Sequence, residues 1–141
     1  MRDPIIILGL GKNLMKLKYK SIPIKMVLID SDQSFSDMMR CGANKYGYDL
    51  TCYSSVSNMG TIGKFRDYDV AIVDNDDGFL SGLEIGKLLN SFIVNMPMVL
   101  VSRKFSAKAL PRKEWPSSIK GLIQKELGAL AIFKATLAAM S

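Results

Sequence analysis

The sequence predicts an α/β fold in which helices cover both faces of a parallel sheet. Four short strand-like segments, the first of them a β-branched run, alternate with segments of helical character, and this alternation favours crossover connections between parallel strands. With 141 residues and 48% hydrophobic content, the chain can form one domain with a substantial core. The predicted elements, in chain order, are strands at 24–30, 48–53, 68–74 and 96–102 and helices at 34–46, 56–65 and 83–92.

Glycines mark where two of these helices end or weaken. Gly47 follows the first predicted helix and stops it, whereas Gly60 and Gly63 interrupt the second. Because crossovers between parallel strands are right-handed, few topologies remain for the sheet.

The C-terminal residues carry apolar side chains at steps of three and four. This spacing predicts a continuous amphipathic helix that begins near Ser117 and Ser118 and reaches Met140, about 35 Å at about 1.5 Å per residue. The apolar positions are Ile119, Leu122, Ile123, Leu127, Leu130, Phe133, Leu137 and Met140.

Charge is segregated along the chain. Residues 1–25 and 103–113 each carry a net charge of +5, residues 26–102 carry −5, and residues 114–141 carry +1. The two basic segments suit an acidic protein, a membrane surface or nucleic acid, or they form a solvated face. No recognition helix or aromatic RNA-binding signature accompanies them, so nucleic acid is the less favoured partner. No apolar stretch approaches the length of a membrane span.

Composition excludes several kinds of site. The chain has no histidine, which rules out His-based acid–base catalysis and His-ligated metal sites. Cys41 and Cys52 fit no zinc or thioredoxin-like spacing, so we expect buried free thiols in a reducing, cytoplasmic setting.

Polar residues gather where the predicted strands end. In parallel sheets of this kind, the ligand site lies beyond the carboxyl ends of the strands, where the strand order reverses. Several carboxylates in one crevice repel one another unless a cation lies among them, and Mg²⁺ suits one or two carboxylates with water and phosphate oxygens. The residues concerned are Asp30, Asp32, Asp74, Asp76, Asp77 and Ser102.

The segment YDVAIVDNDDGFLSGLEIGKLL, residues 68–89, resembles the phosphoacceptor region of bacterial response-regulator receiver domains, the CheY-like family. In that family a strand ends in the phosphorylated aspartate, and a turn of the form D-x-x-x-x-G-x-x-G-x-E follows. The matching residues here are Asp74, Gly78 (one residue early), Gly82 and Glu84.

The resemblance covers residues 25–127 and implies a flavodoxin-like three-layer sandwich whose parallel sheet has the order 2-1-3-4, with a fifth strand at the end. Residues 1–24 are then a basic N-terminal extension and residues 128–141 a helical C-terminal extension, longer than a compact receiver needs. The apolar side chains of this extension pack on their own domain or form an interface, either a homodimer through 117–140 or a contact with a larger partner. We expect the interface, because such a surface seldom stays in water.

The resemblance also implies roles at the strand ends. Asp74 corresponds to the phosphoacceptor, whose carboxylate attacks phosphorus to form an acyl phosphate. Asp30 corresponds to the first acid of the Mg²⁺ site, Ser31 stands where the family has a direct ligand, and Asp32 is the acid that can substitute for it. Ser102 corresponds to the hydroxyl that hydrogen-bonds the phosphoryl group. The implied metal ligands are therefore Asp30, Asp32 and Asp74, for a weakly bound Mg²⁺.

The residues after Ser102 depart from the family pattern. Arg103 replaces a small residue, and it either partly blocks phosphodonors or pairs with Asp74 as a counter-charge. Lys113 resembles the Lys-Pro lysine that pairs with phosphoryl oxygens, but it arrives well before the family's spacing of about 22 residues, so we expect a shortened region before the last helix. Because a helix and a strand together hardly fit there, either the fourth helix is nearly lost or the fifth strand is replaced, and residues 4–10 are a candidate edge strand for that replacement.

These residues predict a stand-alone, atypical receiver in two-component-type signalling that acts by protein–protein interaction, with phosphorylation at Asp74 impaired or absent. The alternative is a phosphorylatable response regulator that uses Mg²⁺. A phosphatase with Asp74 as nucleophile and a nucleic-acid-binding adaptor fit less well. We therefore expect a signalling protein as partner, a kinase or a downstream target, and neither an enzyme nor a small-molecule substrate.

Overall fold

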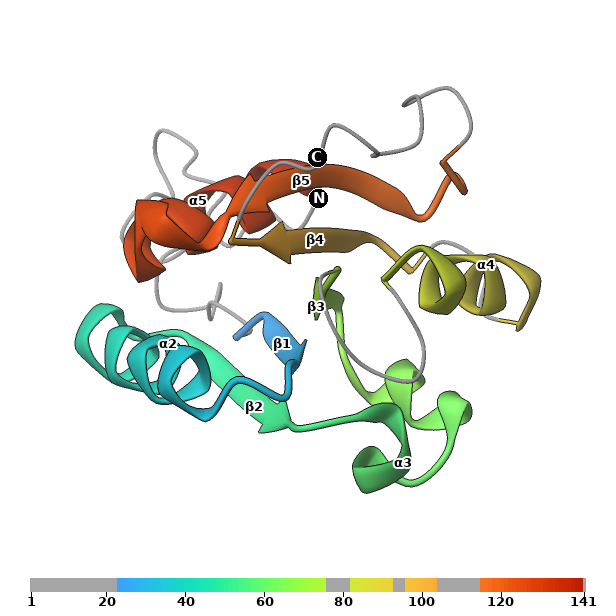
Figure 1. The fold of residues 1–141 in the computed structure, drawn as a ribbon, viewed down its shortest axis with the longest axis horizontal. Helices are drawn as coiled ribbons and strands as arrows, with labels where there is room; N and C mark the ends of the chain where they lie inside the picture. The colour runs from blue at the N-terminus through green and yellow to red at the C-terminus, as the bar shows by residue number, and fades with distance from the viewer. Residues whose placement is uncertain (1–22, 76–81, 93–95, 104–114, 141) are drawn as a thin grey trace, which may run out of the picture.

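The computed structural model describes residues 23–75, 82–92, 96–103 and 115–140. They contain a five-stranded sheet in which all neighbouring strands run parallel, in the order β2-β1-β3-β4-β5 (Figure 1). The predicted flavodoxin-like sheet is thereby confirmed. Its strands are β1 (Lys25–Ile29), β2 (Asp49–Tyr53), β3 (Val70–Asp74), β4 (Met98–Ser102) and β5 (Ile119–Gln124).

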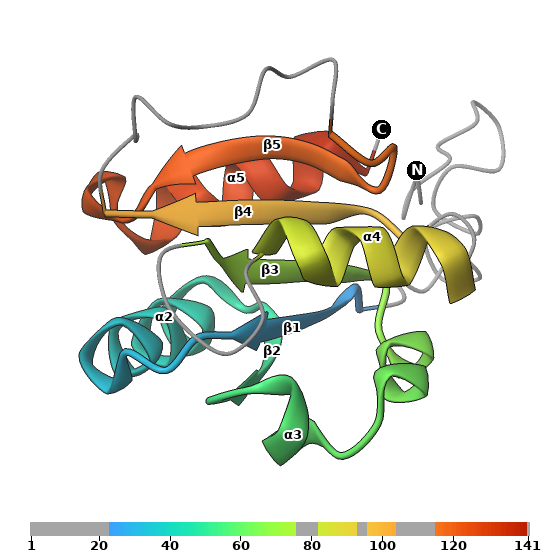
Figure 2. The ribbon, with the colours of Figure 1, turned by 45° about the vertical axis from the view of Figure 1, so that its right-hand side comes forward.

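Helices cover both faces of this sheet. The helical segments are α2 (Gln33–Tyr46), α3 (Val56–Met59), the 3₁₀ segment η1 (Ile62–Asp67), α4 (Gly82–Phe92), the 3₁₀ segment η3 (Lys125–Leu127) and α5 (Ala129–Ala139). The helices α2 and α5 pack on one face, and α3, η1 and α4 lie on the other, as Figure 1 and Figure 2 show together. The chain therefore forms the three-layer sandwich that the alternation of strands and helices predicts.

Each interface between layers has its own apolar core. On the side of α2 and α5, Phe133 is fully buried and its ring stacks on Tyr48, with the centroids 4.6 Å apart. On the other side, the fully buried Phe65 of η1 lies in one cluster with Leu89 of α4. Burying one such large side chain contributes about 1.5–3 kcal/mol, so these two clusters hold the layers together.

Sequence signals at both ends set the limits of α2. Asp32 is the N-cap, and its side-chain oxygen accepts a hydrogen bond from the Phe35 amide at 3.2 Å. Gly47 ends the helix in the left-handed conformation, with φ 79°, which glycine adopts without steric cost. Gly60, with φ 115°, separates α3 from η1, so the weak helix predicted at 56–65 is interrupted as expected.

The predicted continuous helix over 117–140 is wrong. Residues 119–124 form β5, which pairs in parallel with β4, and α5 starts only after Gly128, which has φ 91°. In place of an extended C-terminal helix there is a helix of 11 residues. A fifth strand is thus present after Ser102, so the alternative that this strand is replaced is wrong. The candidate edge strand at residues 4–10 lies outside the described residues.

A bulge in β5 explains the misleading periodicity. Met98 of β4 pairs with Ile119, and the next residue of β4 pairs with Gly121, so Lys120 is an extra residue in the edge strand. Side chains of a strand alternate between its faces, and an extra residue resets the alternation. Ile119 and Leu122 therefore both reach the core on the α4 side although they stand three residues apart, a spacing that also suits one face of a helix.

The apolar positions of 117–140 are used within the domain. Ile132 and Phe133 are fully buried, and Ile123 packs against the same cluster. Among the described residues of this segment, Leu127 is the large apolar side chain that is mostly exposed, at 60%. The structure therefore favours packing on the domain's own sheet over the interface expected from the sequence.

The two cysteines are free, but the expectation that both are buried is wrong. Cys41 is exposed on α2, and Cys52 on β2 is half-buried. Within the part of the chain that the structure describes, no helix has both the length and the apolar character needed to cross a membrane.

Candidate functional site

The carboxyl ends of β1, β3 and β4 bring three polar residues to one edge of the sheet. The strand order reverses between β1 and β3, which is the usual ligand position in such sheets. Asp30 directly follows β1, Asp74 ends β3, and Ser102 ends β4. They are 3%, 4% and 3% exposed, so this edge carries two buried carboxyl groups and a buried hydroxyl. The structure thus brings together three of the site residues predicted from the sequence.

Lys125, the residue that follows β5, supplies the charge that balances the two acids. Its ammonium nitrogen Nζ lies 2.8 Å from Oδ2 of Asp30 and 3.1 Å from Oδ1 of Asp74. The lysine side chain is buried, so the charges attract one another strongly but lose their hydration. A lysine therefore occupies the position between the carboxylates where repulsion requires a cation.

Neighbouring groups fix the positions of Asp30 and Lys125. The Lys125 ammonium lies 4.8 Å from the centroid of the Phe35 ring on α2, a cation–π distance. Oδ1 of Asp30 accepts a hydrogen bond from the Asp32 amide at 2.8 Å. Oδ2 of Asp30 faces the Lys125 ammonium in the ion pair.

Burial and charge shift the pKa values of this pair. Burial raises the pKa of Asp30 above its ordinary value, and the Asp74 charge adds to the rise, while Lys125 and the Asp32 amide oppose it. Burial alone would lower the pKa of Lys125, but the contacts with the two carboxylates outweigh it and the pKa rises. The lysine is therefore a permanent cation at neutral pH.

Both carboxylate oxygens of Asp32 accept hydrogen bonds from neighbouring groups. Its Oδ1 accepts hydrogen bonds from the Ser34 hydroxyl at 2.8 Å and from the Phe35 amide at 3.2 Å. Its Oδ2 forms a charged hydrogen bond with the guanidinium of Arg103. The Arg103 contact is the main reason that the pKa of Asp32 lies well below its ordinary range, and the Ser34 and Phe35 donors add to it. Arg103 is thus a counter-charge within the site, and Asp32 is the acid it pairs with.

Gly82 lets α4 begin close to the end of β3. A Cβ atom on Gly82 would lie 2.5 Å from Cδ2 of Leu100, 3.1 Å from Oδ1 of Asn75 and 3.3 Å from the carbonyl oxygen of Asp74. The first distance is shorter than real Cβ contacts allow, so a larger residue here would force the Leu100 side chain to shift. Residues 76–81 of the same turn lie outside the described residues.

The side chains do not fit a resident Mg²⁺ ion in this arrangement. Mg²⁺ needs carboxylate oxygens directed at one point together with several waters. Asp30 and Asp74 face Lys125. Asp32 faces Arg103, so an incoming metal ion would have to displace a cation from each of the three predicted ligands. No three Asp, Glu, Cys or His side chains converge as a metal-binding group in the described ranges.

Sequence reasoning missed the lysine of the site. Lys113, the predicted partner of the phosphoryl group, lies outside the described residues, whereas Lys125 contacts Asp74. Lys125 stands 23 positions after Ser102, close to the spacing of the receiver family. That spacing was the available signal, but Glu126 follows where the family pattern has proline.

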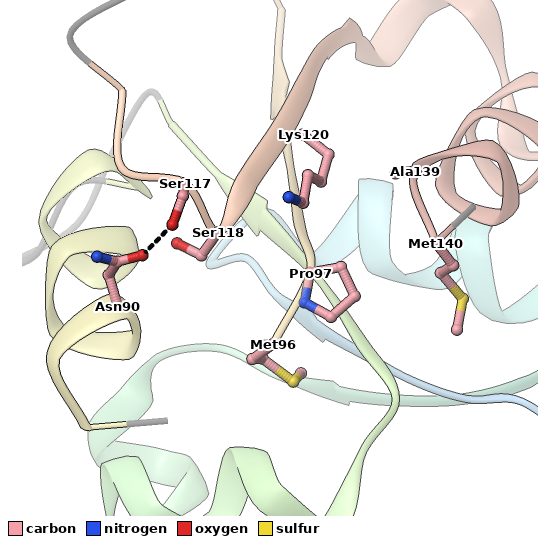
Figure 3. A pocket seen from close by; sticks show the side chains of 8 residues that line it. All are labelled: Asn90, Met96, Pro97, Ser117, Ser118, Lys120, Ala139 and Met140. Carbon is pink, nitrogen blue, oxygen red and sulfur yellow. Dashed lines mark hydrogen bonds between the residues drawn. The ribbon is translucent and has the colours of Figure 1, made fainter. Parts of the chain in front are cut away.

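A hollow of about 240 Å³ lies near the amino ends of β4 and β5, at the opposite edge of the sheet from Asp74 (Figure 3). The Ser117 hydroxyl donates to Oδ1 of Asn90 at 2.6 Å, and the Ser118 hydroxyl donates to a carbonyl oxygen of α4 at 3.1 Å. Both hydroxyl protons are therefore used inside the protein.

No family model and no curated protein matches this chain. Among solved structures, it is similar to a response-regulator receiver domain of Clostridium thermocellum, with 19% identity and a TM-score of 0.69 over 83% of this chain and 94% of that one. It is also similar to a chemotaxis response regulator of Vibrio cholerae (18% identity, TM-score 0.67, 84% and 99% covered) and to a CheY-like receiver domain protein of Methanospirillum hungatei (12%, 0.67, 84% and 94%). Together with the sheet order and the two helical layers, these similarities show that the chain has the CheY-like receiver fold.

Proposed function

We propose that this chain is an atypical receiver domain of two-component-type signal transduction that acts through protein–protein contact, with phosphorylation at Asp74 impaired or absent. The observation that carries the proposal is the pairing of every predicted acidic ligand with an internal cation. Lys125 lies between Asp30 and Asp74, and Arg103 holds Asp32. The edge keeps the layout of a phosphoacceptor site while its charges are already balanced.

The chemistry at Asp74 supports slow or absent phosphorylation. A carboxylate that attacks phosphorus must reach the phosphodonor, and positive charge must stabilise the transferring group. Lys125 supplies such charge, but Asp74 is 4% exposed. Ser31 provides no carboxylate, and Arg103 stands where the receiver family has a small residue. Mg²⁺ therefore binds weakly, and the step that depends on it is impaired.

A receiver of this kind transmits its signal through its surface. Its partner is a signalling protein of the cytoplasm, a kinase or a downstream target, and no small-molecule substrate is turned over. The acidic body at 26–102 and the basic segments at 1–25 and 103–113 provide charge complementarity for such a partner. A homodimer would use surfaces other than most of the apolar positions of 117–140, since Ile119, Leu122, Ile123, Phe133, Leu137 and Met140 belong to or pack against the two cores.

Intact-mass spectrometry after incubation with acetyl phosphate and Mg²⁺ tests the proposal, with Asp74→Asn as the matched control. We expect the wild-type protein to keep its unmodified mass under conditions that phosphorylate a known receiver domain. A phosphoryl adduct on the wild type that Asp74→Asn abolishes would contradict the proposal.

A phosphorylatable response regulator that uses Mg²⁺ is the second candidate. Its support is the retained set of Asp74, Ser102 and Lys125 at one buried edge. The same adduct would identify it. No contact among the described residues favours an Asp74 phosphatase or a nucleic-acid-binding adaptor over these two.

A further inference from the structure

The ion pair between Arg103 and Asp32 spans the end of a strand that belongs to neither residue. Asp32 follows β1, and Arg103 follows β4. In the sheet, β3 lies between β1 and β4. Neighbouring strands are about 4.8 Å apart, so the pair bridges about 10 Å across the carboxyl end of β3. The bridged strand is the one that ends in Asp74.

The ion pair lies on the solvent side of the buried groups. The side chain of Arg103 is 53% exposed and that of Asp32 is 24% exposed. By contrast, Asp30 and Asp74 are 3% and 4% exposed. We call this ion pair the bridge. Among the described side chains at this edge, the bridge is therefore the first that a phosphodonor or metal ion meets when it approaches Asp74 from solvent along the end of β3.

The bridge also withdraws a partly exposed acid that could otherwise capture a cation. Oδ1 of Asp32 caps α2 through the Phe35 amide, and Oδ2 is taken by the guanidinium. Without Arg103, Oδ2 would become available while the N-cap hydrogen bond stayed in place. The local charge beside Asp74 would also fall by one positive unit, which favours cation binding.

We propose that Arg103 is the residue that keeps this site closed to divalent cations and phosphodonors, because its guanidinium ties Asp32 across the end of β3. This inference rests on the proposed function and deepens it. It assigns the impairment to one exposed side chain, whereas the buried set of Asp30, Asp74 and Lys125 stays intact beneath it.

A Mg²⁺ titration followed by ¹H–¹⁵N NMR tests the proposal through the amide shifts of Ser31, Asn75 and Ser102. Arg103→Ala should bind Mg²⁺ about three- to tenfold more tightly than the wild type, the range expected when a surface ion pair and a like charge no longer compete with the metal. Arg40→Ala is the matched control. It removes an exposed arginine that pairs with Asp37 on α2, and it should leave the affinity unchanged.

Equal affinities in the wild type, Arg103→Ala and Arg40→Ala would overturn the assignment to Arg103. Equal gains in the two arginine variants would also overturn it, since the effect would then be one of net charge. The proposed function fails separately: a phosphoryl adduct on the wild-type protein contradicts it whatever the titration shows. An unmodified wild type with no gain in Arg103→Ala removes the Arg103 assignment alone.

Discussion

Nζ of Lys125 lies 3.1 Å from Oδ1 of Asp74, so the strand at the edge of the sheet supplies the counter-charge for the strand at its centre. The same ammonium lies 2.8 Å from Asp30, and one buried cation thus separates two carboxylates that would otherwise repel each other. The stability of the domain and the charge state of the site are consequently linked.

Replacing Lys125 with methionine should lower the free energy of unfolding by about 3 kcal/mol at pH 7, because it leaves two buried carboxylates without a cation. Urea denaturation measures the change. Lys134→Met, on an exposed position of α5, is the control and should change the value by less than about 0.5 kcal/mol. If the free energy of unfolding falls by the same small amount in both variants, the buried ion pairs do not stabilise the fold.

The carboxyl groups of Asp30 and Asp32 should titrate on opposite sides of 3.8, their common ordinary pKa. Burial raises the pKa of Asp30, so the stability that this group contributes is present below pH 3.8 and is lost as the pH rises through the folded-state pKa. Arg103 lowers the pKa of Asp32, so its contribution is present above pH 3.8 and is lost as the pH falls through the folded-state pKa.

Carbon-detected NMR of the side-chain carboxyl groups follows both titrations in one sample. In Arg103→Ala, the pKa of Asp32 should move back towards 3.8, while that of Asp30 should change less, because its main cause is burial. An Asp32 titration that is the same in this variant and in the wild type would contradict the assigned cause.

Ser31→Asp should strengthen Mg²⁺ binding, because it adds a carboxylate directly after Asp30 on an exposed position. We expect about a tenfold gain in affinity, the order of effect that one added ligand or its support has at a metal site. Calorimetry measures it, with Ser91→Asp at the far end of α4 as the control for added charge. An affinity that stays at the wild-type value would show that this edge is not arranged as a receiver metal site.

Gly42→Ala should destabilise the contact between α2 and α5. A Cβ atom on Gly42 would lie 2.5 Å from Cβ of Ala129, which no side-chain rotation can relieve. Overpacking costs about 1–3 kcal/mol and the gain in helix propensity returns about 1, so we expect a net loss of about 1–2 kcal/mol in thermal or urea unfolding. Adding Ala129→Gly should recover most of it. A single variant more stable than the wild type would contradict the close packing.

Removing residues 128–141 should unfold the domain, because it deletes the fully buried Ile132 and Phe133. Losing one buried phenylalanine alone costs about 3–5 kcal/mol, a large part of the stability of a small domain. Circular dichroism and one-dimensional NMR of the truncated chain check this. A truncated chain that stays soluble and folded would contradict this prediction and would show that residues 128–141 are an extension, as expected from the sequence.

The strands β1, β3 and β4 could be predicted from the sequence because they are buried on both faces. Such strands are continuous apolar runs, and the acids that follow them mark the carboxyl edge of the sheet, which placed Asp30 and Asp74 correctly. The contact of Arg103 with Asp32 could not be predicted, since it joins loops from non-adjacent strands and leaves no local pattern. Lys125 was missed because β5 was taken for a helix, and a lysine within a helix gives no hint of a strand end.

The extra residue of β5 is accommodated as a bulge, and the bulge sets which face of the sheet each later residue of the edge strand occupies. Lys120 is exposed, so its chemical identity matters little to the core. If Lys120 instead paired with Val99 in regular alternation, Leu122 would turn towards α5 and Ile123 towards α4, and the chain would reach Lys125 one residue out of register. The charge balance around Asp74 therefore depends on a local backbone irregularity in the edge strand, and not only on the side chains that carry the charges.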